Sequence, residues 1–180
     1  MIGVILTGGA SRRMGTDKAF VVVAGRPMVI RVADALWEAG CAEVVCQGGD
    51  VARLGQLGLA AVPDGSPGGG PAAAIGEVLS RVTAPLVLAA CDLADLDAAT
   101  VRDVVDAGAG ADRVAVAVTT GRPHLLSFWP ESVRIAVDTA LAAGVVAYHD
   151  LLDAVDALHV SVGAAAVRNV NTPGDVPGCR

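Results

Sequence analysis

The segment between residues 7 and 18 combines glycines with positively charged side chains, directly after the apolar run Ile2–Leu6. Glycines let a backbone turn sharply and bring its N–H groups close to an anion, and the segment has three: Gly8, Gly9 and Gly15. Three cations lie within seven residues of one another: Arg12, Arg13 and Lys18. Backbone N–H groups and cations are what hold a triphosphate, so this spacing favours a phosphate-binding loop. Composition alone also allows a solvent-exposed turn.

Two familiar phosphate-binding loops do not fit this segment. A P-loop has the pattern G-x-x-x-x-G-K-[ST], whereas Gly15 is followed by Thr16 here. A dinucleotide-binding loop has the pattern G-x-G-x-x-G, which Gly8-Gly9 does not supply. The residues therefore indicate a phosphate loop of another kind.

Acidic residues follow two further apolar runs. Asp92 comes directly after residues 86–91, and a carboxylate at the end of a buried parallel strand points into the ligand crevice. A hard oxygen ligand there suits Mg²⁺, which takes one or two carboxylates plus substrate phosphates. Asp64 follows residues 59–62 within Pro63-Asp64-Gly65. Taken alone, either aspartate could also be a turn or helix-capping residue.

A family resemblance is carried by residues 6–19, which read L-T-G-G-A-S-R-R-M-G-T-D-K-A. This stretch resembles the L-x-G-G-x-S-x-R-M-G-x-D-K-x signature of the MobA-like nucleotidyltransferases, the molybdenum cofactor guanylyltransferases and their relatives. The resemblance implies a set of nucleotide-binding residues: Leu6, Thr7, Gly8, Gly9, Lys18, Gln47, Asp64 and Asp92. In that set Gly8 and Gly9 hold the triphosphate. The base and sugar are contacted by Leu6, Gln47 and Asp64. The implied catalytic residues are Arg13, Lys18 and Asp92.

Later segments extend the resemblance. Residues 91–96 match the family's C-D-x-P-x-L run, in which the aspartate binds metal and nucleotide, except that Ala94 replaces the proline. Gln47 stands where the family more often has asparagine. Residues 169–175 resemble the closing N-x-N-T-P-x-D signature, which implies that Asn171 lies near the metal with Asp92. Taken alone, this last stretch predicts a helix start with Thr172 as its cap.

The resemblance implies transfer of GMP from GTP to the phosphate of Mo-molybdopterin, with Mg²⁺ as cofactor and release of pyrophosphate. Gly8-Gly9 follows the guanylyl pattern, whereas the cytidylyl relatives more often have Ala-Gly. Such a transfer depends on positioning and charge neutralisation more than on covalent catalysis. Two alternatives stay open: a related nucleotidyltransferase, for example a molybdopterin cytidylyltransferase, and a non-catalytic nucleotide-binding accessory protein.

The chain departs from the family where a basic residue usually follows the glycine that closes the penultimate helix. Here Gly144 is followed by Val145, and residues 135–167 contain neither arginine nor lysine. A molybdopterin-type acceptor carries an anionic phosphate, which needs cations. The remaining candidates are Arg122, His124, His149 and Arg168. The departure therefore bears on the acceptor more than on the nucleotide. Transient contact with other cofactor-biosynthesis proteins is a further expectation.

The elements that must position these residues alternate in type. Apolar runs of strand length occupy residues 2–6, 44–46, 59–62, 86–91 and 114–118. Segments of helical period, several opened by proline or closed by glycine, occupy residues 27–40, 71–82, 97–105 and 130–143. This alternation predicts a three-layer Rossmann-like α/β fold, with a mostly parallel sheet and helices on both faces. The resemblance adds that the fold is of the nucleotide-diphospho-sugar transferase type. We expect one domain over residues 1–180.

Composition restricts the classes of partner. The chain is 53% hydrophobic and 18% charged with a net charge of −6, which indicates a globular protein without the basic face that nucleic acid requires. Apolar runs fall short of the roughly 18 residues that span a bilayer, and the N-terminus lacks a signal-peptide pattern, so we expect a cytoplasmic protein without a membrane partner. The cysteines form no C-x-x-C pair and are expected as buried thiols: Cys41, Cys46, Cys91 and Cys179.

Overall fold

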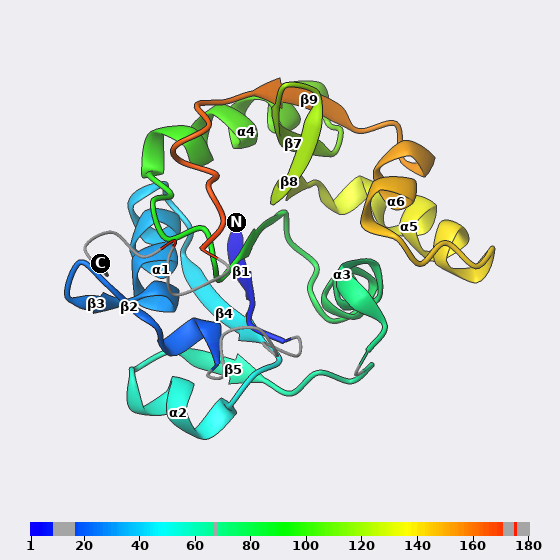
Figure 1. Ribbon diagram of the computed structural model, residues 1–180. Coiled ribbons are helices and arrows are strands. Elements are labelled where there is room, and N and C mark those ends of the chain that lie inside the picture. The colour runs from blue at the N-terminus through cyan, green and yellow to red at the C-terminus, as the bar shows by residue number, and fades with distance from the viewer. Residues whose placement is uncertain (9–16, 67, 171–174, 176–180) are drawn as a thin grey trace.

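A seven-stranded sheet with helices on both faces forms the centre of the protein in the computed structural model, which describes residues 1–8, 17–66, 68–170 and 175 (Figure 1). The strand order is β5-β4-β1-β6-β8-β7-β9. The strands of this sheet are β1 (Ile2–Leu6), β4 (Glu43–Gln47), β5 (Ala60–Val62), β6 (Leu86–Ala90), β7 (Ala115–Thr119), β8 (Arg122–Trp129) and β9 (Leu158–Ser161).

Most strand pairs are parallel. β1 pairs in parallel with β4 and β6, and β4 pairs in parallel with β5. β8 is the exception within the described sheet, because it runs antiparallel to both β6 and β7. The register sets Leu6 beside Gln47 on one side and Ala90 on the other, so three strands end at the same edge of the sheet. Ligands of open α/β sheets bind at that edge.

Helices cover the two faces of the sheet in separate groups. The helices are α1 (Met28–Glu38), α2 (Val51–Gln56), α3 (Gly70–Arg81), α4 (Ala98–Ala111), α5 (Arg134–Ala142) and α6 (Tyr148–Ala154), with the 3-10 helices η1 (Lys18–Phe20) and η2 (Glu131–Val133). One core forms where α1 and α4 pack on the sheet, and a second core forms beneath α3, α5 and α6 (Figure 1). β6 is buried along its whole length between them, as its sequence Leu-Val-Leu-Ala-Ala requires.

Local sequence explains where several helices begin and end. α4 begins after Asp97, whose carboxylate accepts a hydrogen bond of 2.7 Å from the Thr100 N–H. α3 carries Pro71 in its first turn, where a missing N–H costs nothing. α1 ends just before Gly40, which has a φ of +100° that other residues rarely adopt.

A small hairpin connects the first loop to α1. It consists of β2 (Val22–Val23) and β3 (Arg26–Pro27), and its turn contains Ala24 and Gly25, both at positive φ. The hairpin and α1 contribute to a third apolar cluster that also holds residues from the loop after β6 and from the C-terminal segment: Val23, Met28, Ala94 and Val170. This cluster brings distant segments of the chain together near the end of β6.

The structure confirms the predicted fold class and all five predicted strands. It adds β8 and β9, and it adds the short helices α2 and α6. The predicted helix over 130–143 is divided into η2 and α5. β8 escaped prediction because Pro123 lies near its start and its first four residues are only partly buried or exposed, which hides its apolar character. No helix among the described residues has the length and apolar character needed to cross a membrane.

Candidate active site

A cavity of about 400 Å³ opens at the edge where β1, β4 and β6 end. It is lined by residues from the ends of β1 and β6, from η1, from the loop before α3, from the first turns of α3 and from β8: Leu6, Thr7, Gly8, Lys18, Asp64, Gly68, Gly70, Pro71, Ala74, Ala90, Cys91, Asp92 and Leu125. Six predicted site residues are therefore brought together on one cavity: Leu6, Thr7, Gly8, Lys18, Asp64 and Asp92.

The chain leaving β1 is fixed to the end of β4. The Thr7 hydroxyl lies 3.1 Å from the Gln47 carbonyl oxygen and 2.8 Å from the Gly48 carbonyl oxygen, and the Thr7 and Gly8 N–H groups both donate to Gln47 O. Because the Gly8 N–H is engaged in this way, Gly8 contributes a close backbone approach rather than a donor for phosphate. Thr7 is a buried anchor of the cavity wall.

Glycine is required where this loop meets the chain after β4. Gly48 has a φ of +82°, and a Cβ atom there would lie 2.9 Å from the Gly8 Cα. A Cβ atom on Gly8 would lie 3.2 Å from Asp64 Oδ2. These contacts are shorter than side chains normally tolerate, so the two glycines allow Asp64 to reach the cavity beside β1.

Asp92 is the centre of the polar contacts in the site. Its side chain is 12% exposed and lies just after the end of β6. Lys18 Nζ lies 3.1 Å from Asp92 Oδ2, and the Asn169 side-chain amide donates a 2.9 Å hydrogen bond to Asp92 Oδ1. The Val170 N–H donates to the Asp92 carbonyl oxygen. Three segments that are distant in sequence therefore meet at one carboxylate.

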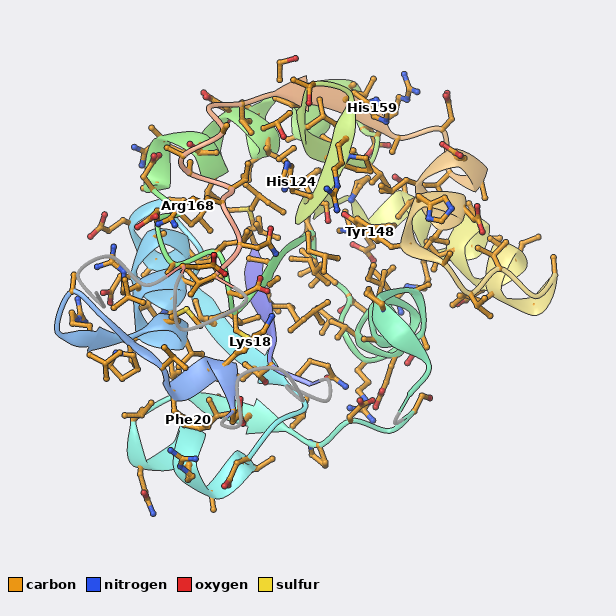
Figure 2. The ribbon with its side chains drawn as sticks, in the orientation of Figure 1. Lys18, Phe20, His124, Tyr148, His159 and Arg168 are labelled. Atoms are coloured by element: carbon orange, nitrogen blue, oxygen red, sulfur yellow. The ribbon has the colours of Figure 1, made fainter. Side chains whose placement is uncertain are left out.

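Lys18 is positioned by η1. The Asp17 carboxylate caps this short helix by accepting a 3.1 Å hydrogen bond from the Ala19 N–H. Phe20 is held from the other side by Arg53 of α2, whose guanidinium carbon lies 3.8 Å from the ring centroid. Figure 2 shows Lys18 near the end of β1, where its ammonium group can approach an anion in the cavity. Lys18 is also the only lysine in the chain.

Asp64 also lines the cavity, from the loop before α3. Its Oδ1 atom accepts a 3.1 Å hydrogen bond from the Ser66 N–H. The neighbouring Gly65 N–H donates to both carboxylate oxygens of Glu77, which ties this loop to α3. Asp64 thus stabilises a turn and also lines the cavity, so a role in the turn does not prevent a contact with the nucleotide.

Gln47 is placed differently from the other predicted residues. Its side chain is 2% exposed and does not line the cavity. Its Nε2 atom lies 3.5 Å from the Pro63 carbonyl oxygen, and its Oε1 atom is buried with no hydrogen-bond partner among the described residues. A buried amide oxygen left in this state is costly. A contact between Gln47 and a nucleotide stays a prediction, and it requires the side chain to turn toward the cavity.

The donor set around Asp92 fits a hard divalent cation. Asp92 offers a carboxylate that the Asn169 amide nitrogen orients, and Mg²⁺ is commonly held by one or two carboxylates with substrate phosphates and water completing its shell. Groups of three or more histidine, cysteine or acidic side chains suited to a metal do not occur within the described residues. Mg²⁺ suits the Asp92 carboxylate, because it takes substrate phosphates and water as its remaining ligands.

Cys91 lines the cavity next to Asp92 but is unsuited to nucleophilic chemistry. Burial, together with the Asp92 charge, raises the pKa of the Cys91 thiol to about 12. The thiol is therefore protonated near neutral pH, and the thiolate is the reactive form.

Several predicted residues lie outside the described part of the chain, namely Gly9, Arg13 and Asn171. Within the described residues, Asn169, the first asparagine of the Asn169-Val170-Asn171 motif, contacts Asp92, and a metal contact of Asn171 stays a prediction. The signal for Asn169 was present in that motif, since its two asparagines stand two residues apart, but spacing alone does not say which one reaches the carboxylate.

The candidate cations for an acceptor phosphate are only partly suited to that role. Arg168 pairs with Asp95 at 2.6 Å, and His149 lies 3.2 Å from Asp150 on the surface. Burial and the charge of Arg122 lower the pKa of His124 from its usual 6.5, so His124 is a poor cation at neutral pH. Its Nε2 atom lies 2.6 Å from the Thr119 hydroxyl.

Comparison with known proteins now adds to this geometry. The family model described as the MobA-like NTP transferase domain matches residues 3–158. The chain belongs to the MobA-like NTP transferase family. That match runs from β1 to the start of β9, so it includes the loops that carry Lys18, Asp64 and Asp92.

Two relatives and one solved structure illustrate the similarity. A probable molybdenum cofactor guanylyltransferase from Pelotomaculum thermopropionicum is 34% identical over 190 residues, covering 99% of this chain and 91% of that protein. A molybdenum cofactor guanylyltransferase from Cereibacter sphaeroides is 36% identical over 149 residues, covering 80% of this chain and 76% of that protein. The crystal structure of molybdopterin-guanine dinucleotide biosynthesis protein A from Archaeoglobus fulgidus has a TM-score of 0.78 at 21% identity, covering 99% of this chain and 96% of that one. At that identity the structure supports the fold alone.

Proposed function

We propose that this protein is a Mg²⁺-dependent molybdenum cofactor guanylyltransferase, which transfers GMP from GTP to the phosphate of Mo-molybdopterin and releases pyrophosphate. The observation that carries the proposal is the meeting of Lys18, Asp92 and Asn169 at the cavity where β1 and β6 end. The relatives described as guanylyltransferases, at 34% and 36% identity, support the choice of nucleotide and acceptor.

The reaction requires an in-line displacement at the α-phosphorus of GTP. An oxygen of the acceptor phosphate forms the new P–O bond, and the bond from the α-phosphorus to the bridging oxygen breaks, so that pyrophosphate leaves with the electron pair. Little covalent chemistry is asked of the protein, and catalysis rests on positioning and charge neutralisation. Cys91, whose thiol is protonated, has no part in this scheme.

Lys18 and Asp92 neutralise each other when no nucleotide is bound. Their separation of 3.1 Å is an ion pair, and the Asp92 carboxylate is the less exposed partner. When GTP binds, its phosphates compete with Asp92 for the Lys18 ammonium group. The Asp92 carboxylate is then available to coordinate the divalent cation. When bound, Mg²⁺ would neutralise charge on the phosphates and the departing pyrophosphate. Asp92 and Asn169 would hold it, and Lys18 would stabilise the same anionic groups.

The cavity walls supply the nucleotide selection in this proposal. Leu6 and Asp64 both line the space that the base and sugar would occupy. Gly8 leaves room for Asp64, because a Cβ atom there would crowd Asp64 Oδ2 at 3.2 Å. A carboxylate can accept two hydrogen bonds from guanine, which presents adjacent N1–H and 2-amino donors, whereas cytosine presents its amino group without a neighbouring ring N–H.

The test is product analysis with competing nucleotides. The full chain is incubated with Mo-molybdopterin, Mg²⁺ and equal amounts of GTP and CTP, and the products are separated and weighed by mass spectrometry. We expect the guanine dinucleotide product with one pyrophosphate released per transfer. A cytosine dinucleotide as the main product would identify a cytidylyltransferase. GTP binding without any product would instead indicate a nucleotide-binding accessory protein.

A further inference from the structure

The loop after β6 makes a tight turn between the catalytic aspartate and α4. The Leu96 N–H donates a 3.0 Å hydrogen bond to the Leu93 carbonyl oxygen, which closes a β-turn with Ala94 and Asp95 at its centre. The first central position of such a turn favours proline, which fixes φ and stiffens the turn. This chain has Ala94 there, so the backbone itself is less restricted. Other contacts must hold the turn that carries Asp92.

Two arginines from distant elements form hydrogen bonds and ion pairs with this turn. Arg31 of α1 donates from Nε to the Ala94 carbonyl oxygen at 2.6 Å, and its NH2 atom lies 3.7 Å from Asp95 Oδ1. Arg168 of the C-terminal segment lies 2.6 Å from the other carboxylate oxygen of Asp95. Figure 2 shows Arg168 on the side of the molecule where α1 and α4 lie. Asp95 is therefore held between two guanidinium groups.

The C-terminal segment contacts this turn at Asp95 and also contacts Asp92, the residue directly before the turn. Arg168 binds Asp95, while the next two residues bind Asp92: Asn169 through its side chain and Val170 through its backbone N–H. A shift of Arg168 would thus be transmitted directly to the groups that orient the Asp92 carboxylate. Ala94 and Val170 also belong to the same apolar cluster, so the loop after β6 and the C-terminal segment pack against each other there.

We propose that Arg31, Asp95 and Arg168 form a clamp that holds the Asp92 carboxylate in position for the divalent cation. The three are positioning residues, because they act through Asp92 and Asn169 and do not line the cavity. The inference rests on the proposed function in its reference to the cation, although the clamp itself is a property of the ligand-free protein.

The clamp affects geometry more than global stability. Exposed ion pairs contribute little to the free energy of unfolding, and the Arg168 side chain is 43% exposed. Groups that orient a metal ligand have larger effects on function, since their loss typically lowers metal affinity or activity about 10- to 100-fold. A clamp variant should therefore melt near the wild-type temperature and yet require more Mg²⁺.

The first experiment compares Arg168→Ala with Arg113→Ala. The Arg113–Asp156 pair has the same 2.6 Å separation, and its arginine is 39% exposed, but it lies at the far end of the sheet. We expect Arg168→Ala to raise the Mg²⁺ concentration for half-maximal turnover about 10-fold or more while Arg113→Ala leaves it unchanged. Equal Mg²⁺ requirements in the two variants would overturn the proposal.

The second experiment uses the ligand-free protein and is independent of activity. Hydrogen exchange is followed at the Leu96 and Val170 amides, which close the turn and bind Asp92 O. In Arg168→Ala both should exchange up to about fivefold faster, as expected for loss of one ion pair, and in Arg113→Ala neither should change. Faster exchange in a protein that proves unable to use GTP would reject the proposed function and keep the clamp. Unchanged exchange with normal wild-type turnover would reject the clamp and keep the function.

A rescue variant separates positioning from a direct role of the arginine charge. No hydrogen bond from the Ala94 N–H occurs within the described residues, so Ala94→Pro can stiffen the turn without removing one. We expect Ala94→Pro combined with Arg168→Ala to recover at least half of the lost Mg²⁺ affinity. If Ala94→Pro alone fails to fold, Arg168→Lys takes its place. It keeps the charge, loses the planar guanidinium group, and should restore Mg²⁺ affinity only in part. A failure of the folded rescue variant, or full Mg²⁺ affinity in Arg168→Lys, would contradict positioning by the clamp.

Discussion

The two halves of the sheet differ in how they use charge. The nucleotide half, made of β5, β4, β1 and β6 with their loops, gathers Lys18, Asp64 and Asp92 around one cavity. In the distal half, made of β8, β7 and β9 with α5 and α6, two arginines contact protein groups away from the cavity. Arg113 binds Asp156, and Arg134 donates to the Val82 carbonyl oxygen. One half holds opposite charges where a ligand can separate them, and the other half uses them to fix its own chain.

The difference teaches where function can be lost. In the nucleotide half, parallel strands end together, so residues from distant parts of the sequence converge on Asp92. In the distal half, the antiparallel strand β8 interrupts that arrangement and contributes only Leu125 to the cavity wall. Substitutions in the first half should therefore reduce catalysis, and comparable substitutions in the second half should not alter nucleotide binding.

The largest expected effect is that of Asp92→Ala. Loss of the carboxylate removes the proposed cation ligand and leaves Lys18 and Asn169 without the group they bind. We expect kcat/KM for pyrophosphate release to fall about 1,000-fold or more, by comparison with removed electrostatic groups in other active sites. Asp92→Asn, which keeps the shape of the side chain, should lose nearly as much. Full activity in a folded Asp92→Ala protein would show that the nucleotide half does not depend on Asp92 for catalysis.

Lys18→Ala should have the next largest effect. Removing its charge should cost about 2–4 kcal/mol of transition-state stabilisation, while Lys18→Arg should retain part of the activity. Because Lys18 is the only lysine, acetylation of its side chain can be followed by the mass of one peptide. GTP with Mg²⁺ should protect it from acetylation. Unchanged kcat/KM in Lys18→Ala, or equal acetylation with and without GTP, would show that the ammonium group does not meet the phosphates.

A pair of glycine substitutions compares the two halves by stability. Gly48 and Gly121 both have positive φ, but only at Gly48 would a Cβ atom meet backbone, 2.9 Å from the Gly8 Cα. Gly121→Ala should lower the free energy of unfolding by about 1–2 kcal/mol from backbone strain alone. Gly48→Ala should lose about 2–4 kcal/mol, because overpacking adds to strain. Urea unfolding measures both. Equal losses of unfolding free energy in the two variants would mean that the backbone can relax the close approach of Gly48 to Gly8 at little cost.

The smallest expected effect belongs to the distal half. His124→Ala removes the 2.6 Å contact with Thr119, and Arg122→Ala removes the charge that helps to lower the pKa of His124. Neither group lines the cavity, so the GTP dissociation constant measured by calorimetry should change by less than about twofold, below 0.5 kcal/mol. A tenfold change in either variant would extend the nucleotide site across β8 and remove the contrast between the halves.

Sequence alone predicted the nucleotide half well because its elements follow strong local rules. Buried parallel strands read as continuous apolar runs, and loops that hold ligands must follow them. The distal half was predicted less completely, since β8 mixes proline and polar residues with its apolar positions and β9 is short and half exposed. Its α6 has only seven residues, too few for a clear helical period.

The site illustrates a second limit of sequence reasoning. Lys18, Asp64 and Asp92 could be placed together from strand ends and motif resemblance, and the structure brings them to one cavity. The clamp around Asp95 could not be predicted from the sequence, because Arg31 lies 63 residues before Ala94 and Arg168 lies 73 residues after Asp95. Ion pairs across such separations depend on packing of complete elements and leave no local pattern. Sequence patterns reveal the groups that meet a ligand more readily than the groups that hold them in place.

The most direct test of the account is nucleotide-dependent stabilisation of the wild-type protein. Thermal unfolding is measured with GTP, CTP, ATP and UTP in turn, each with and without Mg²⁺. A nucleotide at about 100 times its Kd should stabilise the native state by roughly 2.7 kcal/mol, which is readily seen in Tm. We predict that GTP gives the largest rise in Tm, that the rise requires Mg²⁺, and that Asp92→Ala abolishes it. Absence of any rise, or a rise led by another nucleotide, would contradict a GTP site organised around Asp92.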